Sequence, residues 1–191
     1  MTEIKRRSGR FQLLLIAAVF LGPLLVAGWM YYGGGLLAPE GRTNHGLLLE
    51  PIVKLDDELP ASPVLLLHDA SWLLIYANGT ACNKACRERL YVQRQSRLML
   101  GKEMDRVRRI FLHGEDPPDT VFLESEHTDL VSMRDDELLA LLDARTPEGF
   151  PAEGYFLVDP LGNLVMYFAP DIDPYDMVDD IKHLLSLSRI G

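Results

Sequence analysis

The sequence lacks a surplus of basic residues. Its formal net charge is −9 over 191 residues. Residues 33–191 carry −12 once the four basic residues and one acidic residue of the first 32 are set aside. Because a nucleic-acid-binding protein needs a basic surface, this composition argues against nucleic acid as a partner. The chain also contains no internal repeat and no low-complexity segment.

Charged residues are absent from Phe11 to Tyr32, a run of 22 residues. As a helix, a run of this length crosses a bilayer core of about 30 Å. Trp29, Tyr31 and Tyr32 gather at its far end, where an aromatic belt is expected at the membrane surface. We therefore predict a transmembrane helix over 11–32.

The basic residues around this run predict its orientation. Lys5, Arg6, Arg7 and Arg10 precede it, whereas Arg42 alone follows within about 15 residues. Residues 1–10 are then cytoplasmic, and the rest of the chain is periplasmic on a single-pass anchor in the cell inner membrane. A cleaved signal peptide is the alternative, although its apolar region would span only about 7–15 residues.

The chain beyond the anchor divides into two parts. Three consecutive glycines and several prolines predict a linker over 33–60 that has some ordered contact with the domain. Within it, 43–49 is expected to form a turn followed by a short strand. We expect 61–191 to form one compact domain, because about 130 residues suffice for one buried core.

Cysteine is scarce: the chain has only Cys82 and Cys86. They lie between an apolar run, 72–77, and a helix-like stretch, 83–101. The N-terminus of a helix favours thiolate over thiol. Two close thiolates can form and break a disulfide or hold a soft metal such as Cu(I). A structural disulfide is the alternative, although so short a loop adds little stability.

The order of elements indicates an α/β fold. Besides the strand at 72–77 and the helix at 83–101, the pattern predicts strands at 64–68, 107–113, 121–123, 154–158 and 164–168, and helices at 135–144 and 173–187. Strands that alternate with helices are typical of an α/β sheet, and the hairpin at 159–163 makes that sheet mixed rather than purely parallel.

This order resembles the thioredoxin fold. A strand leads to a cysteine pair on a helix, and Phe150-Pro151 precedes a hairpin and a final helix. The resemblance implies that Pro151 is the proline, cis in thioredoxin-like proteins, that faces the cysteines. Cys82, Cys86 and Pro151 are accordingly the candidate catalytic residues.

Within that superfamily the chain is similar to the SCO type of membrane-anchored proteins of cytochrome c oxidase assembly. The similarity lies in the C-x-x-x-C spacing, the single anchor, the loop His113-Gly114-Glu115-Asp116-Pro117-Pro118-Asp119-Thr120 and the hairpin Asp159–Phe168. The resemblance implies copper handling by two cysteines and a histidine. That histidine is missing here, because its position falls at Pro151 and no histidine lies between His127 and His183.

Other residues are candidates to complete the site. His113 ends a predicted strand at the sheet edge where the cysteines should emerge, so it is the best spare metal ligand or proton shuttle. The candidate metal ligands are thus Cys82, Cys86 and His113. His45 could fold back over the site from the linker, and Glu153 is either a proton acceptor near the cysteines or a surface carboxylate.

The basic residues that follow the cysteines have two interpretations. From Lys84 to Arg109 there are nine basic and three acidic residues. Lys84 and Arg87 could lower a thiol pKa further. The alternative is a solvated helix face.

Three functions remain open at this stage. One is an assembly factor that reduces, or hands Cu(I) to, the copper-binding subunit of a cytochrome oxidase. Another is a general periplasmic thiol–disulfide oxidoreductase, such as one serving cytochrome c maturation. The third is a non-catalytic scaffold. In either redox function, Cys82 is expected to attack because it lies nearer the helix N-terminus, and Cys86 to resolve the mixed disulfide.

Overall fold

The computed structural model describes residues 5–32, 44–67, 70–116 and 119–188. The chain forms two compact units, Met1–Thr43 and Asn44–Gly191. The expected linker residues 33–43 and the first four residues lie outside the described residues.

The N-terminal unit contains one long helix, α1 (Lys5–Tyr32), which includes Pro23. Within it Phe11–Trp29 is apolar and long enough to cross a membrane, and none of that window is buried against protein. The predicted N-terminal apolar helix is confirmed. Its exposed apolar side chains match the surface that lipid, rather than a protein core, would cover.

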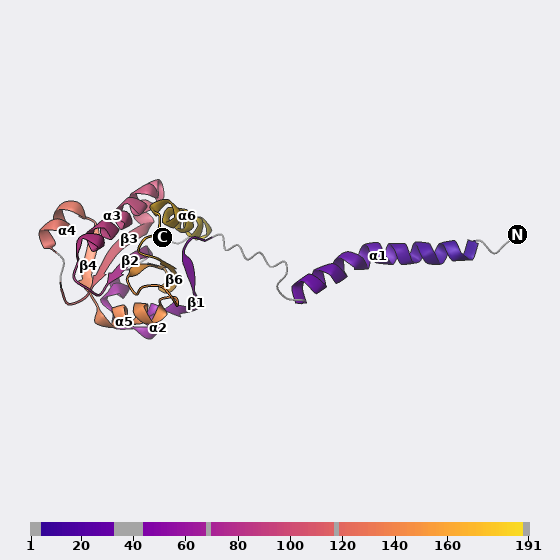
Figure 1. Cartoon of the computed structure of the whole chain (residues 1–191), viewed down its shortest axis with the longest axis horizontal. Coiled ribbons are helices and arrows are strands. Elements are labelled where there is room, and N and C mark those ends of the chain that lie inside the picture. Colours follow the sequence, from indigo (N-terminus) through magenta and orange to yellow (C-terminus); the bar gives the residue numbers. More distant parts are fainter. Residues whose placement is uncertain (1–4, 33–43, 68–69, 117–118, 189–191) are drawn as a thin grey trace. The chain divides into compact units, whose positions relative to one another are not determined.

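The second unit is built on one six-stranded sheet (Figure 1). In chain order its strands are β1 (Leu47–Lys54), β2 (Trp72–Asn78), β3 (Val107–His113), β4 (Leu130–Arg134), β5 (Gly154–Val158) and β6 (Asn163–Phe168). The spatial order is β1-β6-β5-β2-β3-β4. The pairs β2–β3 and β3–β4 are parallel, and the other three are antiparallel. The predicted mixed sheet is therefore confirmed.

Helices cover both faces of this sheet (Figure 1). They are α2 (Leu55–Glu58), α3 (Lys84–Met99), α4 (Thr120–Glu126), α5 (Asp136–Arg145) and α6 (Pro174–Leu187), with 3₁₀ turns at Pro63–Leu66 and Gly101–Arg106. Helices α3 and α6 pack on one face, and α2 and α5 on the other.

Strand β2 lies at the centre of the core. All seven of its residues are buried, and successive side chains point to opposite faces. Leu74 and Tyr76 join the cluster under α3 and α6, whereas Leu73 and Ile75 join the cluster over α5. This two-sided burial explains why β2 is an unbroken apolar run in the sequence.

Two expected strands are wrong. The run predicted as a strand at 64–68 is a 3₁₀ turn, because Pro63 opens it and the Ser62 hydroxyl accepts the Val64 N–H at 3.3 Å. Its last residue, His68, lies outside the described residues. Residues 121–123 belong to α4, since the Asp119 carboxylate caps the helix by accepting the Val121 N–H.

Ordered structure also begins earlier than expected. Residues 44–60, which were expected to be linker with one short strand, contain β1 and α2 and belong to the folded unit. The expected strand is the start of β1, which continues to Lys54. The Gly46 N–H donates to the buried Asp180 carboxylate of α6 at 2.7 Å. This contact fixes the start of β1 against the final helix.

Candidate functional site

The two cysteines form a disulfide at the start of α3. Their Cα atoms are 5.1 Å apart. Asn83 is the N-cap of the helix, and its side-chain oxygen accepts the Cys86 N–H at 3.1 Å. Cys86 is 1% exposed, whereas Cys82, outside the first turn, is only partly buried. The local sequence thus leaves Cys82 partly accessible and buries Cys86 in the core.

The strand register places the candidate residues at one edge of the sheet. Asn78 at the end of β2 pairs with His113 at the end of β3. Strand β5 runs antiparallel to β2 and begins at this edge, with Gly154 opposite Ala77. The loops that carry the cysteines, His113 and Pro151 therefore leave the sheet at the same edge, as the strand order in the sequence predicts.

Two of these loops touch through glycine. The Gly114 N–H donates to the Asn78 carbonyl at 3.3 Å. A Cβ atom added at Gly114 would lie 2.3 Å from the Gly79 carbonyl oxygen, while one added at Gly79 would meet nothing. Only glycine at 114 allows the loop after β3 to approach the cysteine loop this closely.

His113 already has a partner in the chain. Its Nδ1–H donates to the Gly114 carbonyl at 2.9 Å, and its ring packs on Phe111. This bond leaves Nε2 as the ring nitrogen that could accept a proton or bind a metal. Among the described residues, no three His, Cys, Asp or Glu side chains are grouped to hold a metal ion. The metal-ligand role of His113 stays a prediction.

The segment Phe150–Glu153 is held by Tyr167 of β6. The Tyr167 hydroxyl donates to the Pro151 carbonyl at 2.8 Å and lies 3.3 Å from the Glu153 carbonyl. Pro151 is exposed, and its peptide bond with Phe150 is trans; the cis bond of the described chain is Glu50–Pro51. The cis geometry implied by the thioredoxin resemblance is therefore not found at Pro151.

Glu153 joins a cluster with Tyr76 and Arg89. Its carboxylate accepts from the Tyr76 hydroxyl of β2 and pairs with the Arg89 guanidinium of α3. The Glu153 side chain is 29% exposed. Burial, followed by the hydrogen bond and charge of Glu153, raises the pKa of the Tyr76 hydroxyl. Tyr155 adds a bond from its hydroxyl to the Arg89 carbonyl at 2.9 Å.

This cluster ties α3 to the segment before β5, and two of its members were not found from the sequence. Arg89 lies three residues after Cys86, which places the two on the same side of a helix. That spacing was the available signal. Tyr76 gave none, because a tyrosine in an apolar strand is indistinguishable from an ordinary core residue.

The cations nearest the cysteines have acidic partners. The Lys84 ammonium lies 3.7 Å from Glu88 at a highly exposed position. The Arg87 guanidinium lies 3.6 Å from the Asp119 carboxylate and stacks 4.5 Å from the Phe122 ring centroid. Arg87 thus links α3 to α4 and is partly neutralised there.

The arrangement can perform dithiol chemistry. A partly exposed sulfur precedes a helix, and a buried sulfur follows one turn later. This asymmetry lets an external thiol or disulfide reach Cys82 before Cys86.

Comparison with protein families matches two parts of the chain. The family domain described as "Transmembrane-like, thioredoxin-like, C-terminal domain" covers residues 72–188. The domain described as "Transmembrane-like, N-terminal domain" covers residues 2–34. No curated protein matches the sequence.

Solved structures share the fold. Apo Sco1 from Thermus thermophilus aligns with a TM-score of 0.52 at 21% identity, over 73% of this chain and 90% of that one. Copper-bound ScoI from Arabidopsis thaliana gives 0.50 at 17% identity, over 64% and 89%. Copper-bound yeast Sco1 gives 0.50 at 17% identity, over 62% and 80%. The expected thioredoxin-like, Sco-like fold is confirmed.

Proposed function

Because this chain belongs to the transmembrane-like, thioredoxin-like family, we propose that it is a membrane-tethered protein of thiol–disulfide exchange. The observation that carries the proposal is the Cys82–Cys86 disulfide at the start of α3, with one sulfur partly exposed and the other buried. A purely structural crosslink is disfavoured, because a loop closed between residues four apart adds little stability.

In the reduced protein, the Cys82 thiolate attacks one sulfur of a partner's disulfide. A mixed disulfide forms, the partner's S–S bond breaks, and the partner's other cysteine leaves as a thiolate. The Cys86 thiolate then attacks the Cys82 sulfur. The internal disulfide forms, the partner's second thiolate is released, and two electrons have passed from the dithiol to the partner.

The chain's own groups favour this order of attack. Cys82 precedes the helix, where the partial positive charge of the N-terminus stabilises thiolate. The Asn83 side chain holds the first turn by accepting the Cys86 N–H. Pro151 lies three residues before β5, which begins at the same edge of the sheet, and we assign it to the surface that a partner contacts.

The partner we propose is a copper-binding subunit of a cytochrome oxidase. Support comes from the shared fold with Sco proteins, two of which were solved with copper bound. The residues present suit copper in only one oxidation state, Cu(I). Two thiolates suit Cu(I), whereas position 151 holds a proline that offers no ligand atom for Cu(II). Copper would therefore be cargo on the reduced dithiol, with His113 as the candidate third ligand.

A general thiol–disulfide oxidoreductase is the second candidate function. It is favoured by one observation: the described residues include no three-ligand metal group around the cysteines. For both functions we propose an inner-membrane anchor with the N-terminus in the cytoplasm and the folded unit in the periplasm. The basic residues before the apolar helix support this orientation.

An anaerobic Cu(I) competition titration on the reduced full chain in detergent separates the two functions. Tight one-to-one binding that disappears in the Cys82→Ser/Cys86→Ser double variant would support copper handling. Binding no tighter than that of a short dithiol peptide would leave thiol exchange alone.

Single serine variants test the thiol chemistry itself. With a small aromatic disulfide as oxidant, Cys86→Ser should accumulate a mixed disulfide at Cys82. Cys82→Ser should react at least about a hundredfold more slowly, because its remaining thiol is buried. Faster reaction of Cys82→Ser than of Cys86→Ser would overturn the assignment of Cys82 as the attacking residue.

A further inference from the structure

A pocket of about 260 Å³ opens at the sheet edge that carries the cysteines. Its lining combines apolar and aromatic residues with polar ones: Leu47, Phe150, Tyr167, Ala169 and Ile172 on the one hand, and His45, Asp173 and Asp176 on the other. Nothing in the proposed exchange reaction uses this pocket.

The register of the strands fixes where the pocket lies. Leu47 at the start of β1 pairs with Tyr167 near the end of β6, and the next residue of β6, Phe168, pairs with Tyr155. These residues share the edge at which β2 ends and the cysteine loop begins. The pocket therefore lies on the same rim of the sheet as the disulfide, towards β6 and β1.

The walls of the pocket are held in place. Beside His45, the Gly46 N–H is bonded to Asp180 at 2.7 Å, and the His45 Nδ1 lies 3.5 Å from the Asp176 carboxylate. The Phe150 ring packs edge-on against Tyr167, with 5.8 Å between centroids. Contacts from β1, β6 and α6 thus keep the pocket preformed.

The chemistry of the lining specifies its occupant. Phe150 is 44% exposed although it is a large apolar side chain, and the Asp176 side chain, which lines the same pocket, is 43% exposed. Aromatic and aliphatic groups next to carboxylates suit the long carbon chain and the charged end of lysine or arginine. The acidic balance of residues 33–191 favours the same kind of partner.

We propose that this pocket binds a lysine or arginine side chain of the protein segment whose cysteine reacts with Cys82. The inference deepens the proposed function and rests on it. It identifies the partner by its chemistry, as a basic segment next to the target cysteine. Cys82 supplies the reaction, and the pocket supplies recognition.

The geometry of the sheet sets the spacing in the partner. Neighbouring strands lie about 4.8 Å apart, so the two to three strand intervals from β2 to β6 and β1 amount to about 10–15 Å. An extended segment rises about 3.3 Å per residue. The basic residue should therefore lie about three to five positions from the reactive cysteine.

Activated peptides test the inference on the full-length Cys86→Ser variant in detergent. Each peptide carries one cysteine joined to thionitrobenzoate. The Cys82 thiolate forms a disulfide with the peptide cysteine and releases coloured thionitrobenzoate. We expect the peptide with lysine four residues from cysteine to react about fivefold faster at low salt than its glutamate counterpart. Peptides are made with the charge on either side of the cysteine.

Substitutions within α6 provide the matched control. Asp176→Asn should reduce the preference for the lysine peptide at least about twofold. Asp179→Asn makes the same charge change at an exposed position of α6 that is not among the lining residues, so it should keep the preference. A peptide with lysine directly next to the cysteine should lose its advantage over the corresponding glutamate peptide. Equal preferences in the two variants, or no preference for lysine, would overturn the pocket assignment.

Failure of the pocket and failure of thiol exchange give different results. A protein that reacts with a small aromatic disulfide but does not discriminate between the peptides retains the proposed function without the pocket. If no thiol reaction occurs, fluorescence anisotropy with cysteine-to-serine peptides still measures binding. Tighter binding of the lysine peptide, weakened by Asp176→Asn only, would support the pocket; equal binding would overturn it.

Discussion

Two polar clusters lie on the sheet face beneath α3, and they differ in how fully their polar atoms are hydrogen-bonded. The Glu153 cluster consists of Tyr76, Arg89 and Glu153, and each of these side chains has a hydrogen-bond partner. The Arg109 cluster consists of Arg97, Arg109, His127 and Asp129. In it, the Asp129 carboxylate lies near both guanidinium groups, and Arg97 also lies 3.7 Å from the exposed Asp105 carboxylate.

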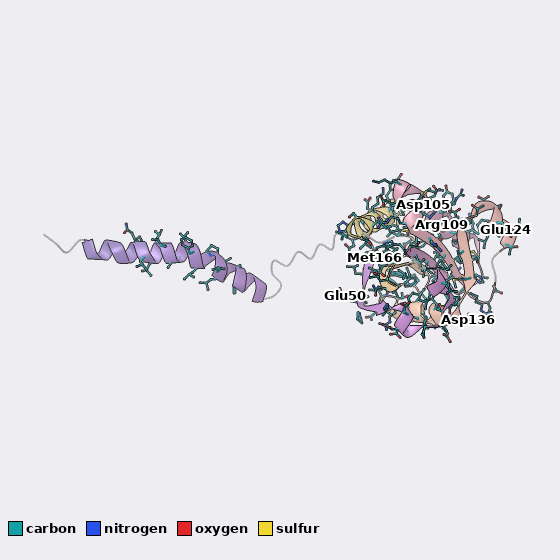
Figure 2. All side chains as sticks on the ribbon, turned by 180° about the vertical axis from the view of Figure 1, so that it is seen from behind. Glu50, Asp105, Arg109, Glu124, Asp136 and Met166 are labelled. Carbon is teal, nitrogen blue, oxygen red and sulfur yellow. A yellow bond between two sulfur atoms is a disulfide. The ribbon has the colours of Figure 1, made fainter. Side chains whose placement is uncertain are left out.

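Arg109 shows the difference most clearly. Its side chain is 1% exposed and lies inside the folded unit (Figure 2). It lies 3.5 Å from the Asp129 carboxylate and 3.4 Å from the His127 Nδ1, yet its Nε and Nη2 atoms have no hydrogen-bond partner within the described chain. Burial, partly offset by Asp129, lowers the pKa of this guanidinium.

The difference separates a cluster placed for the site from one placed within the scaffold. The Glu153 cluster joins α3, which follows Cys82, to the segment before β5 at the same edge of the sheet. The Arg109 cluster joins α3 to β3 and to the residues just before β4. Arg109 lies four residues before the end of β3, away from the edge where the cysteine loop begins. We therefore expect changes in the first to alter thiol reactivity and changes in the second to alter stability alone.

The largest effect is expected for Arg109→Ala. Removing a large buried side chain should lower the free energy of unfolding by about 2–4 kcal/mol, because a cavity remains. Urea denaturation followed by the fluorescence of the buried Trp72 measures it. Arg109→Met fills most of the volume without a charge, so it should stay within about 1 kcal/mol of the parent. Equal losses in both variants would show that the ionic contacts, rather than packing, stabilise this region.

A smaller effect is expected for Glu153→Gln. The substitution removes the carboxylate that neutralises Arg89, one helical turn from Cys86, so the remaining cation should favour thiolate at the site. Alkylation of the reduced protein by iodoacetamide at neutral pH should become about threefold faster. Asp129→Asn makes the same change in the Arg109 cluster and should leave the rate unaltered. A similar acceleration in both variants would contradict the expectation that only the Glu153 cluster affects thiol reactivity.

The smallest effect concerns pH. Burial, followed by the charges of Arg109 and Arg94, lowers the pKa of His127 below its ordinary value of 6.5. The unfolded chain therefore binds a proton more readily than the folded chain, and His127 should destabilise the fold as the pH falls below 6.5. Urea denaturation from pH 7.5 to 5 should show a shallower loss of stability in His127→Gln. An unchanged slope in that variant, or an equal change in His183→Gln, would contradict it.

Much of the fold and part of the site could be predicted from local patterns. The uncharged run 11–32, the buried strands β2, β3 and β5 and the helices that follow the cysteines and the hairpin were recognised because their signals are contained in neighbouring residues. Cys82 and Cys86 could be located in the same way, because they lie between a predicted strand and a predicted helix and so fall at the start of that helix. The short segments at 63–66 and 120–126 were misread because capping and a proline, rather than hydrophobic periodicity, determined them.

By itself, then, the sequence determined an N-terminal apolar helix long enough to cross a membrane, a mixed α/β sheet and a cysteine pair at the start of a helix. The tertiary structure alone decided the trans bond at Pro151, the pairing of Glu153 with Tyr76 and Arg89, and the pocket beside Phe150. Tyr76 and Arg89 lie 77 and 64 residues from Glu153. Side chains so far apart in the chain acquire their partners only when the sheet brings its strand ends to a common edge, and no local pattern records that proximity.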